Sequence, residues 1–540
     1  MNPGSVGQTF RRMLRGLPLL LISALAAPPA FADEFSTAAV TSLRVDWRAA
    51  LNQLRSELNT SPVVAAEFIF SGRRGLPAYD PRQIPALVRL NAISGRFFPG
   101  IGRSAVPVLL PFDAATLLDA DPKAEPDGDL LARVQSGFRP VEMFDAGPSG
   151  YDAVFAIEPG GGGDLPPRVF AKPVEVQITG SNLIYAIADP PGGKGEPVKA
   201  LAAQYPDLRR FIREGYVRYA FTRFGAAYVV SIQCLDSVPK PKRLACRESY
   251  PVAERFLAAL RIAGGRPYRP RRDIQPAVAE RPAAPSADFT YRPSGEIIAN
   301  SGFRKQQGRP DFTVYAQIRF PIEKPPAYAR SQSYVPHRPA VGGNSPYAYP
   351  WRDNFCESRS FGVGQCATGF GHQGQDIRPG ACLPGQPDCD VKQQGVVAVR
   401  DGVLIRSPKQ QAVTLQVNTS REHIRFRYMH MNPFELDADG VLNGRRVSEG
   451  ERFGAVGNYL DHPNGTTRHL HFDVQVFTPD GWIWVNPYTT LVSAYERLLG
   501  GRGREITPDG QPVAIEVHAT PEGPTRAAEE REGGEPIEAP

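Results

Sequence analysis

The feature that most constrains the fold is an alternation of polar and apolar side chains at residues 469–473. The stretch reads His469-Leu470-His471-Phe472-Asp473. On a β-strand successive side chains point to opposite faces, so the two histidines and the aspartate share one face. Leu470 and Phe472 then point into a core. We therefore predict a strand over residues 469–477 with metal-binding side chains on its polar face.

Two further segments carry the same residue types. Residues 371–376 read Gly-His-Gln-Gly-Gln-Asp, and their two glycines argue against a helix. We expect His372 and Asp376 to converge through a turn or an irregular strand. The other segment, Tyr428-Met429-His430, ends an expected strand. None of the eight histidines precedes His337, so the first half of the chain supplies no histidine chemistry.

Coordination chemistry divides these residues into two groups. Catalytic zinc takes three nitrogen or oxygen ligands and leaves a fourth position for water, and His372, Asp376 and His471 meet that need. Such a site keeps a charge of about +1, which lowers the pKa of bound water to around 7 and stabilises an oxyanion. His430 and His469 remain as non-ligand histidines, suited to accepting the proton of the water and bracing a tetrahedral intermediate.

Each signal has a simpler alternative. A single histidine in a strand is usually structural, and an H-x-H pair also occurs in other β-rich metal proteins. A non-hydrolytic metal protein of the cupin type would need a glutamate and a further histidine at other spacings, which the chain lacks. Because all three segments fall within about 100 residues, we predict a metal site.

The N-terminus has the three-part layout of a secretory signal peptide. Arg11, Arg12 and Arg15 precede an apolar run over 17–27, and residues 30–32 read Ala-Phe-Ala. We predict cleavage after Ala32, export to the periplasm or cell envelope, and no stable membrane span afterwards. An uncleaved membrane anchor is the alternative.

The charge balance argues against nucleic acid as a partner. The whole chain carries a net charge of +6, from 62 basic and 56 acidic residues. Removal of residues 1–32 takes away three arginines and no acid, which leaves 59 basic residues and a charge of about +3. Nucleic-acid binders concentrate lysine and arginine far more strongly.

Six cysteines in an exported chain predict disulfides. Their spacing suggests the local pairs Cys234–Cys246, Cys356–Cys366 and Cys382–Cys389, although 15 connectivities are possible. A thiolate zinc cluster is disfavoured, because no two pairs have the C-x₂-C spacing of such sites.

Composition and periodicity predict a multidomain chain. The signal peptide covers 1–32, and an α+β domain of unknown role covers 33–265. A Pro/Arg-rich linker follows at 266–311, which cannot bury a core. Residues 312–500 read as mostly β-strand, and 501–540 as a disordered acidic tail.

Several elements are expected within these boundaries. Apolar spacing predicts a helix from Trp47 to Leu58 and another over 252–260, stopped by Gly264. Alternation predicts a hairpin over 396–405 around an Asp-Gly turn. Residues 412–417 and 423–429 form another expected strand pair, and 487–499 a closing helix that ends at Gly500.

The three histidine segments resemble the lysostaphin/LytM-type zinc peptidases, which cleave peptide bonds in bacterial peptidoglycan. The family pattern is H-x-G-x-D, then Y-x-H, then H-L-H-F followed by an acid. The matching positions run from His372 to Asp376, from Tyr428 to His430 and from His469 to Asp473. The resemblance covers about residues 312–500.

This resemblance implies a fold, a site and an activity. The fold is an antiparallel β-roll or barrel-sandwich hybrid. His372, Asp376 and His471 become ligands of one zinc ion, and His430 and His469 the catalytic pair. The implied function is a zinc-dependent endopeptidase that hydrolyses peptidoglycan cross-links during cell-wall remodelling. Outside the resemblance, the role of 33–265 is open among substrate targeting, docking of other cell-envelope proteins and autoinhibition.

One alternative within the family is a non-catalytic regulator that binds or activates other wall hydrolases. Relatives of that kind lose metal ligands, whereas every ligand position is filled in this chain. The filled positions favour the enzyme.

The chain also departs from the family pattern. Asp473 replaces the commoner glutamate, and we expect it to change only a hydrogen bond behind a ligand. Residues 459–468 form a longer loop that contains His462, which we expect to be exposed. His423 is expected at the surface, and Trp482 and Trp484 are expected to pack in the core rather than against a ligand.

Overall fold

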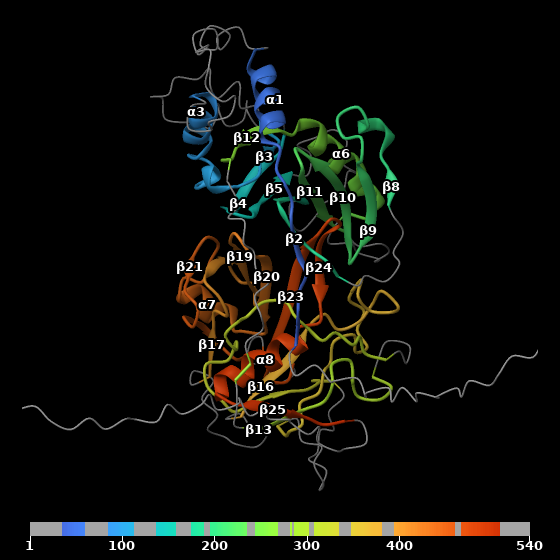
Figure 1. Ribbon diagram of the computed structural model, residues 1–540, viewed down its shortest axis with the longest axis vertical. Coiled ribbons are helices and arrows are strands. Elements are labelled where there is room, and N and C mark those ends of the chain that lie inside the picture. The colour runs from blue at the N-terminus through green and yellow to red at the C-terminus, as the bar shows by residue number, and fades with distance from the viewer. Residues whose placement is uncertain are drawn as a thin grey trace, which may run out of the picture. The chain divides into compact units, whose positions relative to one another are not determined.

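The protein is built mostly of β-strands, with few helices, as a computed structural model shows (Figure 1). The structure describes residues 35–59, 85–112, 137–157, 174–187, 195–234, 244–267, 281–282, 286–301, 307–333, 347–380, 394–458 and 466–507. The predicted signal peptide, His462 and most of the predicted acidic tail lie outside these ranges. No helix in the described ranges has both the length and the apolar character needed to cross a bilayer.

The N-terminal part contains a seven-stranded antiparallel sheet. Its strands, in spatial order, are β4 (Arg139–Gly147), β5 (Gly150–Ile157), β6 (Val174–Ser181), β11 (Ala226–Gln233), β10 (Tyr216–Arg223), β9 (Arg209–Arg213) and β8 (Glu196–Pro197). Nearby helices are α1 (Trp47–Asn59), α3 (Pro85–Ser94) and α6 (Tyr250–Ala259), with single 3-10 turns at Ile101–Arg103, Lys199–Leu201 and Arg247–Ser249. Helix α1 matches the prediction, and its periodic residues Trp47, Leu51 and Leu54 are buried.

The second predicted helix ends earlier than expected. Helix α6 stops at Ala259, and Arg261–Gly264 form strand β12, which pairs with β3 (Val108–Leu110). The glycine that we expected to stop the helix therefore lies in a strand. The apolar spacing does not distinguish a last helical turn from a short buried strand.

The C-terminal part contains an eight-stranded antiparallel sheet, which does not close. Its strands are β15 (Ala327–Ala329), β16 (Gln375–Pro379), β23 (Leu470–Thr478), β20 (His423–Met429), β19 (Val413–Asn418), β18 (Gly402–Ile405) and β21 (Arg446–Val447), with β24 (Gly481–Val485) beside β23. Smaller pairs are β17 (Gly395–Val397) with β22 (Arg452–Ala455), β1 (Ser36–Thr37) with β14 (Thr313–Val314), and β2 (Val40–Ser42) with β7 (Leu183–Tyr185). Helices α7 (Pro433–Ala438) and α8 (Tyr488–Leu499) complete this part.

Two predictions for this part are confirmed and one is wrong. Strands β19 and β20 pair as expected, and α8 ends at Gly500, whose φ of 69° suits glycine. The hairpin over 396–405 does not form, because β17 pairs with β22 while β18 pairs with β19 and β21. Alternation identified the strands but not their partners.

Part of the predicted linker is folded. Residues Ser286–Tyr291 form β13, which pairs in parallel with β25 (Arg502–Glu505) at the start of the predicted tail. Phe289 is fully buried, with its ring centroid 4.7 Å from that of Trp351 and 4.9 Å from that of Tyr495. Proline and arginine dominate the composition of 266–311, but its few aromatic residues carry enough apolar surface to join the C-terminal core.

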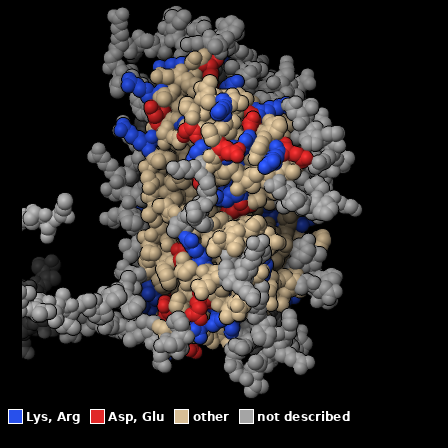
Figure 2. Space-filling view, turned by 90° about the vertical axis from the view of Figure 1, so that its right-hand side faces the viewer, with Lys and Arg blue, Asp and Glu red and all other residues tan. Residues whose placement is uncertain are grey.

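Buried hydrophobic residues form two large clusters. One draws on residues 47–263, and the other on Tyr185 and residues 289–495. The described residues from Phe35 onward nevertheless form one compact unit. The predicted domain boundaries stay a prediction. Figure 2 shows one face of the molecule, on which basic and acidic side chains are interspersed.

Two predicted disulfides are present. Cys234 pairs with Cys246, and Cys356 pairs with Cys366. Cys382 and Cys389 lie outside the described residues.

Candidate metal centre

The register of three neighbouring strands brings the histidine segments together. Strand β23 lies between β16 and β20, and His471 is paired with Asp376 on one side and Met429 on the other. His430 directly follows β20, and His469 directly precedes β23. Leu470 and Phe472 are fully buried on the opposite face of β23, as the alternation predicts.

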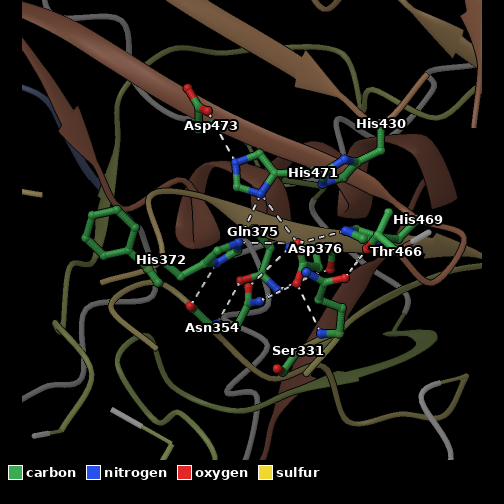
Figure 3. Close-up of polar contacts among 12 residues, drawn as sticks. Ser331, Asn354, His372, Gln375, Asp376, His430, Thr466, His469, His471 and Asp473 are labelled. Carbon is green, nitrogen blue, oxygen red and sulfur yellow. Dashed lines mark hydrogen bonds and ion pairs between the residues drawn. The ribbon is translucent and has the colours of Figure 1, made fainter. Parts of the chain in front are cut away.

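His372, Asp376 and His471 form a tight buried group (Figure 3). Asp376 Oδ1 lies 3.4 Å from His372 Nε2 and 3.4 Å from His471 Nδ1. The two ring nitrogens are 3.0 Å apart. All three potential ligand atoms lie within 4.8 Å of one another, which is close enough for one ion to contact them all.

The other two histidines join the same group. His469 Nε2 lies 3.3 Å from Asp376 Oδ1, and the ring centroids of His430 and His469 are 4.7 Å apart. In Figure 3 the rings of His469 and His471 turn toward Asp376. The structure thus brings together all five predicted site residues.

Hydrogen bonds fix the tautomers of the two histidines nearest each other. His372 Nδ1 donates to the carbonyl oxygen of Asn354 at 3.1 Å, and His471 Nε2 donates to Asp473 Oδ2 at 3.3 Å. Both partners are acceptors, so these ring nitrogens carry the protons. In the neutral rings, His372 Nε2 and His471 Nδ1 therefore face each other with lone pairs, an arrangement that calls for a cation between them.

The same reasoning applies to the remaining pair. His469 Nδ1 donates to the carbonyl oxygen of Thr467, and His430 Nδ1 donates to Gln411 Oε1 at 3.0 Å. Gln411 Oε1 also accepts the backbone N–H of His430, which confirms that it is an acceptor. Both rings thus keep an unprotonated Nε2, and that of His469 faces Asp376.

Two buried polar atoms at the centre make no hydrogen bond. They are Asp376 Oδ1 and His469 Nε2. By contrast, Asp376 Oδ2 accepts hydrogen bonds from Asn354 Nδ2 at 2.8 Å and from the backbone N–H of Gln332 at 3.1 Å. Since buried polar atoms are nearly always hydrogen-bonded, the unsatisfied carboxylate oxygen fits a metal ligand.

The electrostatics of the site suit a divalent cation. Burial alone would raise the pKa of Asp376, but His372 and His469 outweigh it and hold that pKa well below its usual range. Burial lowers the pKa of His372, and burial together with His469 and His471 lowers the pKa of His430 to about 2. In contrast, Asp376 and Asp473 outweigh the effect of burial and raise the pKa of His471. Zn²⁺ binds neutral imidazoles and an anionic carboxylate, so it competes with a proton at His471.

Asp473 occupies the place expected from the sequence, behind His471. Besides His471, it accepts hydrogen bonds from Arg427 Nε at 2.7 Å and from Trp484 Nε1 at 3.1 Å. The Arg427 guanidinium helps to keep the pKa of Asp473 low against the effect of burial. Trp482 and Trp484 are both buried, as the core-packing prediction requires.

Sequence reasoning missed two neighbours of the site and misplaced one histidine. Asn354 and Gln411 contact site histidines, yet neither belongs to a motif segment. No signal in the sequence identifies them, because they reach the site through loop packing. The prediction of a surface position for His423 is wrong, since this residue is fully buried against Asp152 with a contact of 2.8 Å.

Comparisons with known proteins add little. No family model matches the chain, and no curated protein matches it. A crystal structure from Ruminococcus gnavus, named as a candidate glycyl-glycine endopeptidase lytM, aligns at 22% identity with a TM-score of 0.18. The alignment covers 24% of this chain and 49% of that one, so this chain spans about half the length of that structure.

Proposed function

We propose that the chain is a zinc-dependent endopeptidase that hydrolyses peptide cross-links of bacterial peptidoglycan. The observation that carries this proposal is the group of imidazole nitrogens around one unsatisfied carboxylate oxygen. The choice of substrate rests on the resemblance of the three histidine segments to lysostaphin/LytM-type peptidases. Disulfides are compatible with action outside the cytoplasm, in the periplasm or cell envelope.

His372, Asp376 and His471 would hold the metal through Nε2, Oδ1 and Nδ1. Zinc supplies a Lewis acid and lowers the pKa of its water to near 7. Only two of the four imidazoles are then ligands, which leaves His430 and His469 free for proton transfer.

His469 and His430 are the proton carriers in this proposal. In each ring the Nδ1–H group donates a hydrogen bond to a fixed acceptor. Nε2 is therefore available in each ring to accept a proton from the attacking water. The water oxygen bonds to the carbonyl carbon, the C–N bond breaks, and the carried proton passes to the leaving nitrogen. The low pKa of His430 keeps this ring neutral.

The surrounding strands keep these groups in place. Leu470, Phe472 and Tyr428 are fully buried, and the Tyr428 hydroxyl also accepts a hydrogen bond from the backbone N–H of Val399 at 3.0 Å. A site on strands with packed side chains holds its geometry better than a site on loops.

We also propose that 312–500 is the peptidase domain and 33–265 a separate α+β domain.

Digestion of purified cross-linked peptidoglycan tests the proposal. The mature protein, with zinc content measured, is incubated with defined muropeptides and the products are identified by mass. We expect one zinc per chain, cleavage of a cross-link peptide bond, and loss of cleavage after chelation. A protein with full zinc that cleaves no cross-linked sacculus would contradict the enzyme and favour the regulator that binds other wall hydrolases.

A further inference from the structure

We propose that Asn354 is the positioning residue of the metal centre, held in place by a loop that the Cys356–Cys366 disulfide closes. This inference rests on the proposed zinc site and identifies what keeps its ligands in register. We call residues 351–372 the bracket loop. It runs from Trp351 to His372 and contains both cysteines.

Asn354 contacts two candidate ligands through three different groups. Its Nδ2 donates to Asp376 Oδ2 at 2.8 Å, and its Oδ1 accepts the backbone N–H of Asp376 at 3.1 Å. Its carbonyl oxygen accepts the Nδ1 proton of His372 at 3.1 Å. Asn354 is fully buried, so water does not compete for these contacts.

Each contact has a separate consequence for the metal. The bond from Nδ2 occupies Asp376 Oδ2 and leaves Oδ1 as the atom that faces the imidazoles. The bond to the Asp376 backbone fixes the start of β16. The bond to the carbonyl oxygen selects the tautomer of His372 in which Nε2 carries the lone pair. One residue outside the motif therefore sets the geometry of two ligands within it.

The bracket loop holds Asn354 against the motif. The backbone N–H of Cys356 donates to the His372 carbonyl at 2.8 Å, and that of His372 donates to the Glu357 carbonyl at 2.8 Å. Asn354 N–H in turn donates to Gln375 Oε1 at 3.1 Å. These bonds tie the two chain segments together on both sides of the ligand.

The disulfide sits directly at this junction. A Cβ placed on Gly371 would lie 2.7 Å from Cys356 Cα and 2.9 Å from Cys366 Sγ, so the cysteines press against the residue before His372. The cross-link joins residues 10 apart in sequence, which restricts the conformations that the loop can adopt. Without it, the loop can move away and take the Asn354 carbonyl with it.

Zinc affinity of side-chain variants tests the role of Asn354. In Asn354→Asp the acceptor for the Asp376 backbone is kept while the donor to Asp376 Oδ2 is lost, and Asn354→Ala removes both. We expect the dissociation constant for zinc, measured by competition with a chromophoric chelator, to rise about 10–100-fold in each variant.

Asn418→Ala is the matched control for this measurement. Asn418 makes similar cross-connections, accepting the backbone N–H of Ser149 at 3.1 Å and donating to the Gly150 carbonyl at 3.0 Å, but it does not contact the site histidines. This variant should lower the thermal stability of the metal-free protein without changing its zinc affinity. If Asn354 had a purely structural role, the Asn354 variants would likewise lose thermal stability without a change in zinc affinity.

Paired cysteine variants test the bracket loop. Cys356→Ser/Cys366→Ser should weaken zinc binding, whereas Cys234→Ser/Cys246→Ser removes the other described disulfide and should not. If the Cys356→Ser/Cys366→Ser variant does not fold, the zinc affinity of Asn354→Asp tests the inference by itself. Zinc binding within about twofold of wild type in both Asn354 variants overturns the inference, whereas failure of the wild-type chain to bind zinc overturns the proposed function instead.

Discussion

Two buried clusters in this molecule contain a carboxylate and histidine, and they differ in how their polar atoms are satisfied. The Asp152 cluster joins β5 to β20 and β24. Its carboxylate accepts hydrogen bonds at 2.5–3.3 Å from Thr179, Gln416, His423, Arg425 and Trp482. Both oxygens have donors, and Arg425 supplies a positive charge.

The candidate metal centre around Asp376 has the opposite balance. Asp376 Oδ1 makes no hydrogen bond, and the ring nitrogens around it are acceptors in the neutral rings. Donors are in excess around Asp152, whereas acceptors are in excess around Asp376. An excess of buried acceptors is stable when a cation joins them.

Residue type alone therefore does not identify a chemical site. Ser181, His423 and Asp152 are the residue types of a serine-hydrolase triad, with His423 Nδ1 2.9 Å from Ser181 Oγ. However, all three are at most 1% exposed, and Ser181 Oγ also contacts the backbone of Leu183. The cluster is a satisfied structural network.

The largest predicted difference between the clusters comes from removing each carboxylate. Asp376→Ala should weaken zinc binding by more than about 100-fold, beyond the loss of an outer hydrogen bond, and abolish peptidase activity. Asp152→Ala should keep one zinc per chain in the folded protein. Inductively coupled plasma mass spectrometry after dialysis gives both values, and equal zinc loss in the two variants would contradict the comparison.

The next largest effect concerns the two proposed proton carriers. His430→Ala and His469→Ala should each lower kcat by about 10²–10⁴-fold, because the attacking water loses its base. Both variants should retain zinc, since neither residue is a proposed ligand. If zinc is lost from the His430 variant, His430 belongs to the ligand set and the assignment of roles is wrong.

Stability should respond to the Asp152 cluster. Asp152→Ala leaves the buried His423 and the largely buried Arg425 without their carboxylate, so we expect the free energy of unfolding to fall by about 3–5 kcal/mol. Urea denaturation of the metal-free protein measures this loss. Asp480→Ala, which removes partly exposed ion pairs with Arg209 and Arg213, is the control and should cost at most about 1 kcal/mol.

Lowering the pH should reduce the free energy of unfolding by a smaller amount through the same carboxylate. Although burial opposes it, Arg425 and His423 lower the pKa of Asp152 to about 2. Because the folded-state pKa lies below the unfolded value, the contribution is complete above about pH 4 and is lost as the pH falls toward 2, about 2 kcal/mol in all. Asp152→Asn should remove this part of the acid-unfolding curve, and an unchanged curve would contradict the network.

The sequence predicted elements best where local periodicity decides the structure. Helices α1 and α8 and the pair β19–β20 are confirmed. Periodicity does not specify which strand pairs with which, so the expected hairpin over 396–405 was wrong. The folded stretch at β13 was missed because its two buried aromatics, Phe289 and Tyr291, are masked by the surrounding proline and arginine.

The site residues also divide into those that local spacing predicted and those that only the folded structure brings to the site. Spacing within a strand placed His469 and His471 on one face, and metal chemistry selected Asp376 from its short segment. The sequence could not identify Asn354 and Gln411 as neighbours of the site, because their contacts depend on loops that converge only in the folded chain. Asp152 and His423, 271 residues apart, show the same dependence on tertiary structure.

Anomalous diffraction at the zinc edge, from crystals of the protein purified without added metal, tests the central claim most directly. We predict one anomalous peak per chain, about 2.0–2.2 Å from His372 Nε2, Asp376 Oδ1 and His471 Nδ1. A folded protein with no peak at these atoms, even after soaking with zinc, would contradict the account.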